Sequence, residues 1–147
     1  MKTISIVIPC YNEEENVEAL YLEIKRIFNE FLSSYKYELI YIDNDSVDRT
    51  RDIIRALCIK DKGVKAIFNA KNFGQFNSPY YAMINSTGDA TMLMAADFQD
   101  PPEMIVKFVK AWEEGYKIAI GIKSSSKEAA LMYHLRGLYY KLIKKFS

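Results

Sequence analysis

The stretch from Ile4 to Glu15 reads ISIVIPCYNEEE, and it contains the change of pattern that decides the fold. Its first half is a short apolar run rich in β-branched residues, which predicts a buried strand. Asn12 then stands in the position of a helix N-cap, and Glu13–Glu15 would face the positive end of a helix dipole. A strand that leads directly into a helix is the repeating unit of an α/β domain.

Short apolar runs and longer helical patterns continue to alternate along the chain. Besides Ile4–Ile8, we expect strands at Tyr37–Ile42, Val64–Phe68, Ala90–Met94 and Lys117–Ile122. We expect helices after Asn12, from about Asp48 to Lys60, from Ser78-Pro79 to Gly88, and from a capping box of Asp100 and Glu103 to Gly115. Strands that alternate with crossover helices predict a Rossmann-like, mainly parallel sheet flanked by helices.

Length and composition bound the class of protein. The chain has 147 residues, half of them hydrophobic, which corresponds to a single domain with a substantial core. No apolar run approaches the ~20 residues that a membrane span needs, and the first run is too short for a signal peptide. Cys10 and Cys58 are too few for a disulfide framework and fit a reducing compartment, so we expect a cytoplasmic protein.

The last part of the chain differs from the rest in charge. Residues 123–147 contain six basic residues and one acidic residue, although the net charge of the whole chain is only +1. An acidic body with a basic tail argues against nucleic-acid binding, and it allows the tail to meet phosphate or an anionic membrane surface. We therefore divide the single domain 1–147 into a core, 1–122, and a basic tail, 123–147.

The tail has the pattern of one amphipathic helix. Its apolar stripe comprises Leu131, Met132, Leu135, Leu138, Tyr139, Leu142, Ile143 and Phe146. A stripe of this size is costly to leave in water, so we expect it to pack on a missing C-terminal part of the protein, on a membrane surface, or on a second chain. In the isolated chain, a second copy would cover the stripe, so we expect a homodimer with exchanged helices. The alternative is a monomer in which the helix folds back on its own sheet.

Carboxylates follow two of the predicted strands. Asp43, Asp45 and Asp48 come after the second strand, and Asp97 and Asp100 come after the fourth. In doubly wound sheets, ligands bind at the carboxyl ends of the strands, where such side chains can converge on a hard cation. Asp45 and Asp48 have turn formation and capping as alternatives, and Asp100 has helix capping, whereas Asp97 has no capping role.

Several other kinds of site find little support. The sequence contains no Gly-x-Gly-x-x-Gly motif and no Walker loop, which argues against dinucleotide oxidoreductases and P-loop enzymes. His134 is the only histidine and lies in the tail, so a Ser-His-Asp triad or a histidine metal site is not expected. Cys10 follows a strand directly, and we interpret it as a packing residue. Tyr11, in the loop after the first strand, could stack on a base.

Four segments, in order and at the predicted strand ends, resemble motifs of family 2 glycosyltransferases with the GT-A fold. Ser5–Glu14 resembles the opening of that family, and Asp43–Thr50 (DNDSVDRT) resembles its Asp-Asp-Gly-Ser-x-Asp-x-Thr motif. Lys71–Gly74 (KNFG) is similar to its Arg-Asn-x-Gly segment. Ala95–Glu103 (AADFQDPPE) resembles the Asp-Ala-Asp-Leu-Gln-Asp-Pro-Pro-Glu signature, which is typical of polyprenyl-phosphate sugar synthases related to dolichol-phosphate mannose synthase.

The resemblance implies a role for each matching residue. Those that would bind the nucleotide are Pro9, Tyr11, Glu13, Asp43 and Asp45. Asp97 would hold Mg²⁺ or Mn²⁺ against the diphosphate, with Gln99 nearby. Lys123 and Arg136 would face the acceptor phosphate. Asp97 and Asp100 would be the catalytic carboxylates, with Asp100 the one candidate for a general base.

The implied activity is inverting transfer of a hexose from a nucleotide diphosphate sugar to a polyprenyl phosphate, in cell wall or polysaccharide biosynthesis, by an enzyme peripheral to the inner face of the cell membrane. Transfer to a sugar hydroxyl of a polysaccharide is one alternative, and it requires a general base. A non-catalytic nucleotide-binding or assembly module is another. It is favoured by Asn44 and Ala95, which stand where the motifs have aspartate. Asp45 stands where the second motif has glycine, so that turn should be altered.

Overall fold

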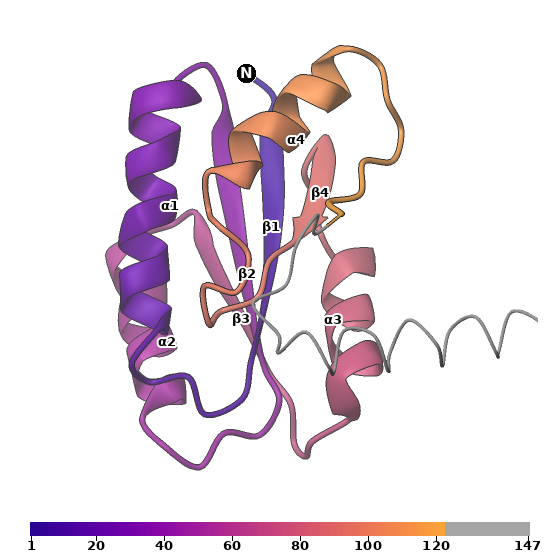
Figure 1. Ribbon diagram of the computed structural model, residues 1–147. Coiled ribbons are helices and arrows are strands. Elements are labelled where there is room, and N and C mark those ends of the chain that lie inside the picture. Colours follow the sequence, from indigo (N-terminus) through magenta and orange to yellow (C-terminus); the bar gives the residue numbers. More distant parts are fainter. Residues whose placement is uncertain (123–147) are drawn as a thin grey trace, which may run out of the picture. The chain divides into compact units, whose positions relative to one another are not determined.

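Strand β1 (Thr3–Cys10) lies inside a parallel sheet of order β3-β2-β1-β4 (Figure 1). It pairs with β2 (Lys36–Asp43) on one side and with β4 (Ala90–Leu93) on the other, while β3 (Val64–Phe68) pairs with β2. The register places Cys10 beside Asp43 and Asp43 beside Phe68, so three strands end level with one another. This computed structural model describes residues 1–122, and Met1–Lys117 form one unit. The predicted parallel α/β fold is confirmed.

Helices cover both faces of the sheet (Figure 1). On one face, α1 (Val17–Phe31), α2 (Thr50–Lys60) and α4 (Met104–Glu113) share a single core with the strands. On the other face, α3 (Gly74–Ile84) contributes Ala82 to a smaller cluster. No described helix is long and apolar enough to cross a membrane.

The alternation of side chains along β1 divides these two cores. Ile4, Ile6 and Ile8 are fully buried toward α1, α2 and α4, whereas Val7 belongs to the cluster under α3. Both sets are apolar because a parallel strand is covered on both faces. Ser5, on the α3 face, is the polar exception within the buried part of the strand.

Three helices do not begin where we predicted. The residues expected to cap them either bind other groups or lie before the first turn of the helix. α1 begins at Val17, and Asn12 instead has a φ of 57° and accepts a hydrogen bond from Val47 N. α3 begins at Gly74 and contains Pro79, while the buried Ser78 accepts a hydrogen bond from a side chain at the end of β3. The predicted capping box at the start of α4 is wrong, because that helix begins only at Met104.

The predicted strand Lys117–Ile122 is wrong. These residues have no regular secondary structure, and Ile118, Ile120 and Ile122 are largely exposed. An alternating apolar pattern forms a strand only when a neighbouring strand pairs with it and one face is buried. No strand partner for this segment occurs within residues 1–122. The predicted tail helix, 123–147, and the dimer that depends on it lie outside the described residues.

A buried acidic residue joins the sheet to the segment between α3 and β4. Glu38 accepts hydrogen bonds from Ser5 Oγ and Lys65 Nζ, and from the backbone N (2.9 Å) and Oγ1 (2.6 Å) of Thr87. Burial opposes its charged form, but the hydrogen bonds from Lys65, Ser5 and Thr87 outweigh burial and lower the pKa of Glu38 to about 2. Ser5 Oγ in turn accepts a hydrogen bond from Gly88 N at 2.9 Å.

Gly88 is required at this junction because the backbone passes so close to β1. A Cβ atom there would lie 2.5 Å from Ser5 Oγ and 2.8 Å from both Ser5 N and Thr3 O. We expect Gly88→Ala to lower the free energy of unfolding by about 2 kcal/mol, as measured by chemical denaturation, because backbone atoms must move. At Gly74 a Cβ would meet nothing within 4 Å, and only the positive φ opposes it, so Gly74→Ala should cost about 1 kcal/mol. A Gly88→Ala variant more stable than the Gly74→Ala variant would contradict this reasoning.

Candidate functional site

The loops after β1 and β2 are locked together at the carboxyl edge of the sheet. Five hydrogen bonds between them join a side chain of one loop to the backbone of the other. These bonds are Asn12 N to Ser46 Oγ (2.9 Å), Val47 N to Asn12 Oδ1 (2.9 Å), Glu13 N to Thr50 Oγ1 (2.8 Å), Glu14 N to Asp48 Oδ2 (3.2 Å) and Arg49 N to Glu14 Oε2 (3.0 Å). The two loops therefore form one rigid rim, and Asp48 has the turn-forming role that we had weighed against ligation.

Asp43 ends β2 with its side chain fully buried, and its two oxygens differ in their partners. Oδ2 accepts hydrogen bonds from Arg51 Nε (2.5 Å) and from the backbone N of Asp45 and of Ser46 (both 3.2 Å). Oδ1 is buried and has no hydrogen-bond partner within residues 1–122. A buried, unpartnered carboxylate oxygen is costly, so this atom is a candidate for binding a ligand that donates a hydrogen bond.

Asp45 has a φ of 71°, a conformation that glycine adopts without strain. The motif resemblance places glycine at this position, and the expectation of an altered turn is therefore wrong: the backbone keeps a left-handed residue here. The Asp45 side chain accepts a hydrogen bond from Arg51 Nη2 at 3.2 Å. Its role is local to the rim.

Asn44 uses its amide to connect the rim to the loop after β3. Its Oδ1 accepts hydrogen bonds from Asn69 Nδ2 (3.1 Å) and Phe73 N (2.9 Å). Its Nδ2 donates to Asn72 Oδ1 (2.7 Å) and faces Gly74 O at 3.4 Å. An aspartate could supply the accepting half of this arrangement but not the donating half. Asn44 is therefore a structural part of the edge.

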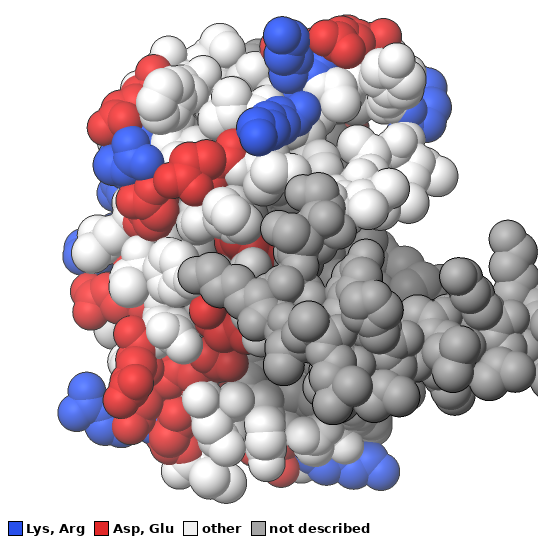
Figure 2. Space-filling model, viewed as in Figure 1, with Lys and Arg blue, Asp and Glu red and all other residues white. Residues whose placement is uncertain are grey.

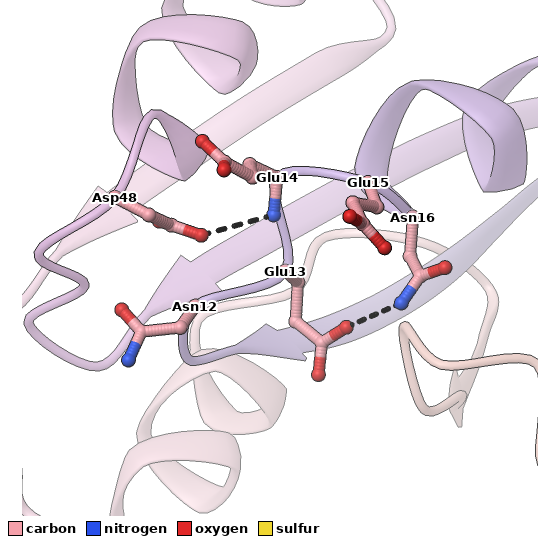
Figure 3. A pocket seen from close by; sticks show the side chains of 6 residues that line it. All are labelled: Asn12, Glu13, Glu14, Glu15, Asn16 and Asp48. Carbon is pink, nitrogen blue, oxygen red and sulfur yellow. Dashed lines mark hydrogen bonds between the residues drawn. The ribbon is translucent and has the colours of Figure 1, made fainter.

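An acidic pocket lies beside the rim, at the start of α1 (Figure 3). It has a volume of about 190 Å³ and is lined by Asn12, Glu13, Glu14, Glu15, Asn16 and Asp48. Glu13 Oε2 accepts a hydrogen bond from Asn16 Nδ2 at 2.7 Å, and Glu14 N donates to Asp48. Figure 2 shows acidic side chains gathered over this part of the molecule. Four carboxylates would repel a diphosphate, so this pocket does not fit the anionic part of a nucleotide.

Two other predicted residues flank the same edge. Tyr11 is half exposed at the end of β1, where its ring is accessible to a ligand, and Pro9 is half-buried in the strand. Cys10 is buried, and burial, followed by the nearby carboxylates of Glu13 and Asp43, raises the pKa of its thiol. The thiol thus remains protonated and serves as a packing group.

The predicted metal residues follow β4. Asp97 is exposed, and its Oδ1 accepts a hydrogen bond from Gln99 N at 3.1 Å. Phe98, between them, has a φ of 58°, a strained conformation for a bulky residue. Asp100 is also exposed. Within residues 1–122, no three acidic, cysteine or histidine side chains converge on a common metal position.

This donor set fits a metal that is held mainly by its ligand. Mg²⁺ is commonly bound by one or two carboxylates together with substrate phosphates and water. Asp97 offers one exposed carboxylate for such an ion. Lys123 and Arg136, the predicted acceptor residues, lie outside the described part of the chain.

Arg51, which joins three segments of this edge, was not predicted from the sequence. Besides Asp43 and Asp45, its Nη2 donates to the backbone oxygen of Asn69 at 2.6 Å. The available signal was a basic residue in the first turn of the helix that follows three aspartates.

Together, the parallel sheet and the polar loops at its carboxyl edge define a Rossmann-like ligand-binding domain. Residues 5–146 match the model of the family Glycosyl transferase family 2. The chain therefore belongs to family 2 of the glycosyltransferases, as the motifs had predicted.

Curated relatives agree with this assignment. The chain is 31% identical over 140 residues to the uncharacterized glycosyltransferase YkcC of Bacillus subtilis, covering 95% of this chain and 43% of that protein. It is 32% identical over 145 residues to the prophage bactoprenol glucosyl transferase homolog of Escherichia coli, covering 98% of this chain and 47% of that protein. It is 37% identical over 118 residues to a dolichol-phosphate mannosyltransferase of Pyrococcus furiosus, covering 80% and 32%. The chain thus spans less than half the length of each of these relatives.

Solved structures share the fold at lower identity. The S. aureus protein TarS, residues 1–349 in complex with UDP-GlcNAc, superposes with a TM-score of 0.62 at 18% identity, over 88% of this chain and 38% of that one. The mannosyltransferase PcManGT of Pyrobaculum calidifontis, in complex with GDP-Man and Mn²⁺, superposes with a TM-score of 0.55 at 20% identity. The superposition covers 64% of this chain and 27% of that one. The described fold is that of the GT-A glycosyltransferases.

Proposed function

We propose that the whole protein transfers a hexose, with inversion, from a nucleotide diphosphate sugar to a polyprenyl phosphate. Family membership supports the reaction class. The names of two relatives, a bactoprenol glucosyl transferase homolog and a dolichol-phosphate mannosyltransferase, support the lipid phosphate acceptor. The observation that carries the donor half of the proposal is the buried, unpartnered Oδ1 of Asp43 at the carboxyl edge.

The nucleoside would bind at the ends of β1 and β2. Asp43 Oδ1 would accept a hydrogen bond from the base, and the exposed ring of Tyr11 would stack on it. Pro9 would line this subsite, and Asp45 would support it through Arg51. Glu13 faces the acidic pocket, so its role would be to hold the rim beside the nucleotide.

The diphosphate would lie toward the end of β4. Asp97, with Gln99 beside it, would hold Mg²⁺ or Mn²⁺ there. The bound ion would neutralise the charge that develops on the diphosphate leaving group. Asp97 would supply one carboxylate ligand, and the diphosphate and water would supply the other ligands of the ion.

A lipid phosphate acceptor makes modest chemical demands on the protein. A polyprenyl phosphate is already anionic at neutral pH, so it needs positioning and charge shielding, and it does not need a general base. Lys123 and Arg136 would supply that shielding. A lipid acceptor also implies that the protein works at a membrane surface, and we propose a peripheral position on its inner face.

A thermal-shift panel tests the donor half of the proposal. The 147-residue chain is mixed with UDP, GDP and their hexose conjugates, each with and without Mn²⁺. A ligand that binds only the folded state raises Tm, by an amount equivalent to about 2.7 kcal/mol at 100 times Kd. We expect a metal-dependent rise with one of these nucleotides. No rise with any of them at millimolar concentration would overturn the proposal.

Asp97→Asn should remove the metal-dependent part of this Tm rise while leaving the Tm of the free protein unchanged. The side chain is exposed, and among residues 1–122 its hydrogen bond is a local one from Gln99 N, so folding should not depend on its charge. The matched control is Asp52→Asn, which removes an exposed carboxylate that pairs with Arg55. An unchanged Mn²⁺ dependence in Asp97→Asn would show that the ion is held elsewhere.

A further inference from the structure

Arg51 joins three segments of the carboxyl edge through one guanidinium group. Its Nε donates to Asp43 at the end of β2, and its Nη2 donates to Asn69 O at the end of β3 and to Asp45 in the rim. Asn69 N also donates to Asp43 O at 2.9 Å, so the two strand ends lie next to each other. The side chain of Arg51 is about one-quarter exposed, whereas that of Asp43 is fully buried.

The arrangement leaves the two oxygens of Asp43 with different tasks. Oδ2 receives three donors, two of them from the backbone of the rim and one from Arg51. Oδ1 receives none. A carboxylate that is charged and fully engaged on one side can neither rotate freely nor donate a hydrogen bond on the other. Asp43 is therefore held as a fixed acceptor.

We propose that Arg51 is a positioning residue that makes this site selective for one class of nucleobase. The inference rests on the proposed nucleotide-binding function and names the class of base that the site prefers. A fixed acceptor suits uracil and guanine, whose pairing edges present a ring N–H. At the same place, cytosine and adenine present an acceptor nitrogen that would face the carboxylate lone pair, and their donor, the exocyclic amino group, lies at a different position that a fixed acceptor does not follow.

Loss of Arg51 should remove this selectivity. Without Arg51, the buried carboxylate of Asp43 loses one of the three donors that hold Oδ2, so it can turn. A carboxylate that can turn can accept a hydrogen bond from the ring N–H of one class of base or from the exocyclic amino group of the other. Arg51 thus acts through Asp43 and does not need to contact the nucleotide.

Calorimetric titration of the full chain with two matched pairs of nucleotides, in the presence of Mn²⁺, tests the inference. The pairs are UDP with CDP, and GDP with ADP, which differ only in the base edge. We expect the wild-type protein to prefer the first member of the better-binding pair by about tenfold or more. In Arg51→Met that ratio should fall to within about threefold of one. Arg51→Lys keeps the charge, but its single ammonium group cannot donate to three acceptors as the planar guanidinium does. The affinity ratio in this variant should therefore be intermediate.

Arg55→Met is the control for position and for loss of charge. Arg55 lies one turn further along α2. Both guanidinium groups lie over the Phe68 ring, with Cζ 4.7 Å from the ring centroid for Arg55 and 5.9 Å for Arg51. Arg55 makes no hydrogen bond with Asp43, so Arg55→Met should keep the wild-type ratio. A purely structural role of Arg51 would weaken both nucleotides of a pair equally.

The outcomes separate this inference from the proposed function. If the wild-type protein binds none of the four nucleotides, the proposed function itself fails. If it binds them without preference, or if the preference is unchanged in Arg51→Met, Arg51 does not position a selective acceptor. Should Arg51→Met not fold, as judged by circular dichroism, Arg51→Lys decides by the same ratio, and an unchanged ratio there overturns the inference.

Discussion

Replacing Glu38 by alanine should lower the free energy of unfolding by about 3 kcal/mol, the free energy that corresponds to lowering its pKa from 4.5 to about 2. Its carboxylate is buried and accepts hydrogen bonds from Ser5, Lys65 and Thr87. Removing it leaves the buried Ser5 hydroxyl without its acceptor and the Thr87 backbone without a partner. Chemical denaturation at pH 7 measures the loss.

Acid provides a second readout of the same residue. Because the folded pKa of Glu38 lies below its usual value, its contribution is fully present above pH 4.5 and is lost as the pH falls toward about 2. The stability difference between the wild-type protein and Glu38→Ala should therefore narrow between pH 4.5 and pH 3. The control is Glu30→Ala, which removes an exposed glutamate paired with Arg26 and should change little. A difference that stays constant with pH would show that the loss comes from packing and not from the charge.

Asp43→Ala should weaken the binding of the preferred nucleoside diphosphate by about 100-fold, equivalent to about 2.7 kcal/mol. The physical reason is the loss of a buried acceptor at the edge that has no partner among the residues the structure describes. The nucleotide sugar should weaken by a similar factor, because Asp43 would contact the nucleoside and not the hexose. Isothermal titration of both ligands measures the two factors.

Two variants keep this result interpretable. Asp43→Asn retains the shape of the side chain, so it separates loss of the acceptor from a disturbance of β2. Asp52→Ala removes an exposed carboxylate at the start of α2 and should leave binding unchanged. If Asp43→Ala weakens only the nucleotide sugar, Asp43 belongs to the hexose subsite and the assignment of the nucleoside to it is wrong.

The regular elements could be predicted from the sequence because their patterns are local. The alternation of Ile4, Ile6 and Ile8 with Ser5 and Val7 is a property of β1 alone, and burial on both faces follows from it. The helical stripes of α1 and α4 are equally local. The segment Lys117–Ile122 carries a similar apolar pattern, but pairing with another strand is not a local property, and the prediction failed there.

The candidate site was predicted less completely, because its side chains take their roles from neighbours far away in the chain. Asn12 has the sequence position of a helix cap, yet its oxygen binds Val47 N in another loop. Ser78 likewise binds Asn69 instead of capping α3. The motifs identified Asp43, whereas Arg51 becomes visible only when α2 is placed against the strand ends. Tyr11 as a base-stacking residue remains a prediction.

The amide of Asn44 has a consequence for the exchange of motifs between relatives. Asn72 Oδ1 accepts hydrogen bonds from Asn44 Nδ2 and from Gly74 N, so its amide is already committed to one orientation. An aspartate at position 44 would place an oxygen against that oxygen. Residue 44 and the loop after β3 are thus linked, and importing only the Asp43–Thr50 segment from a relative with aspartate there would require the Asn72 amide to turn over and give up the hydrogen bond from Gly74 N.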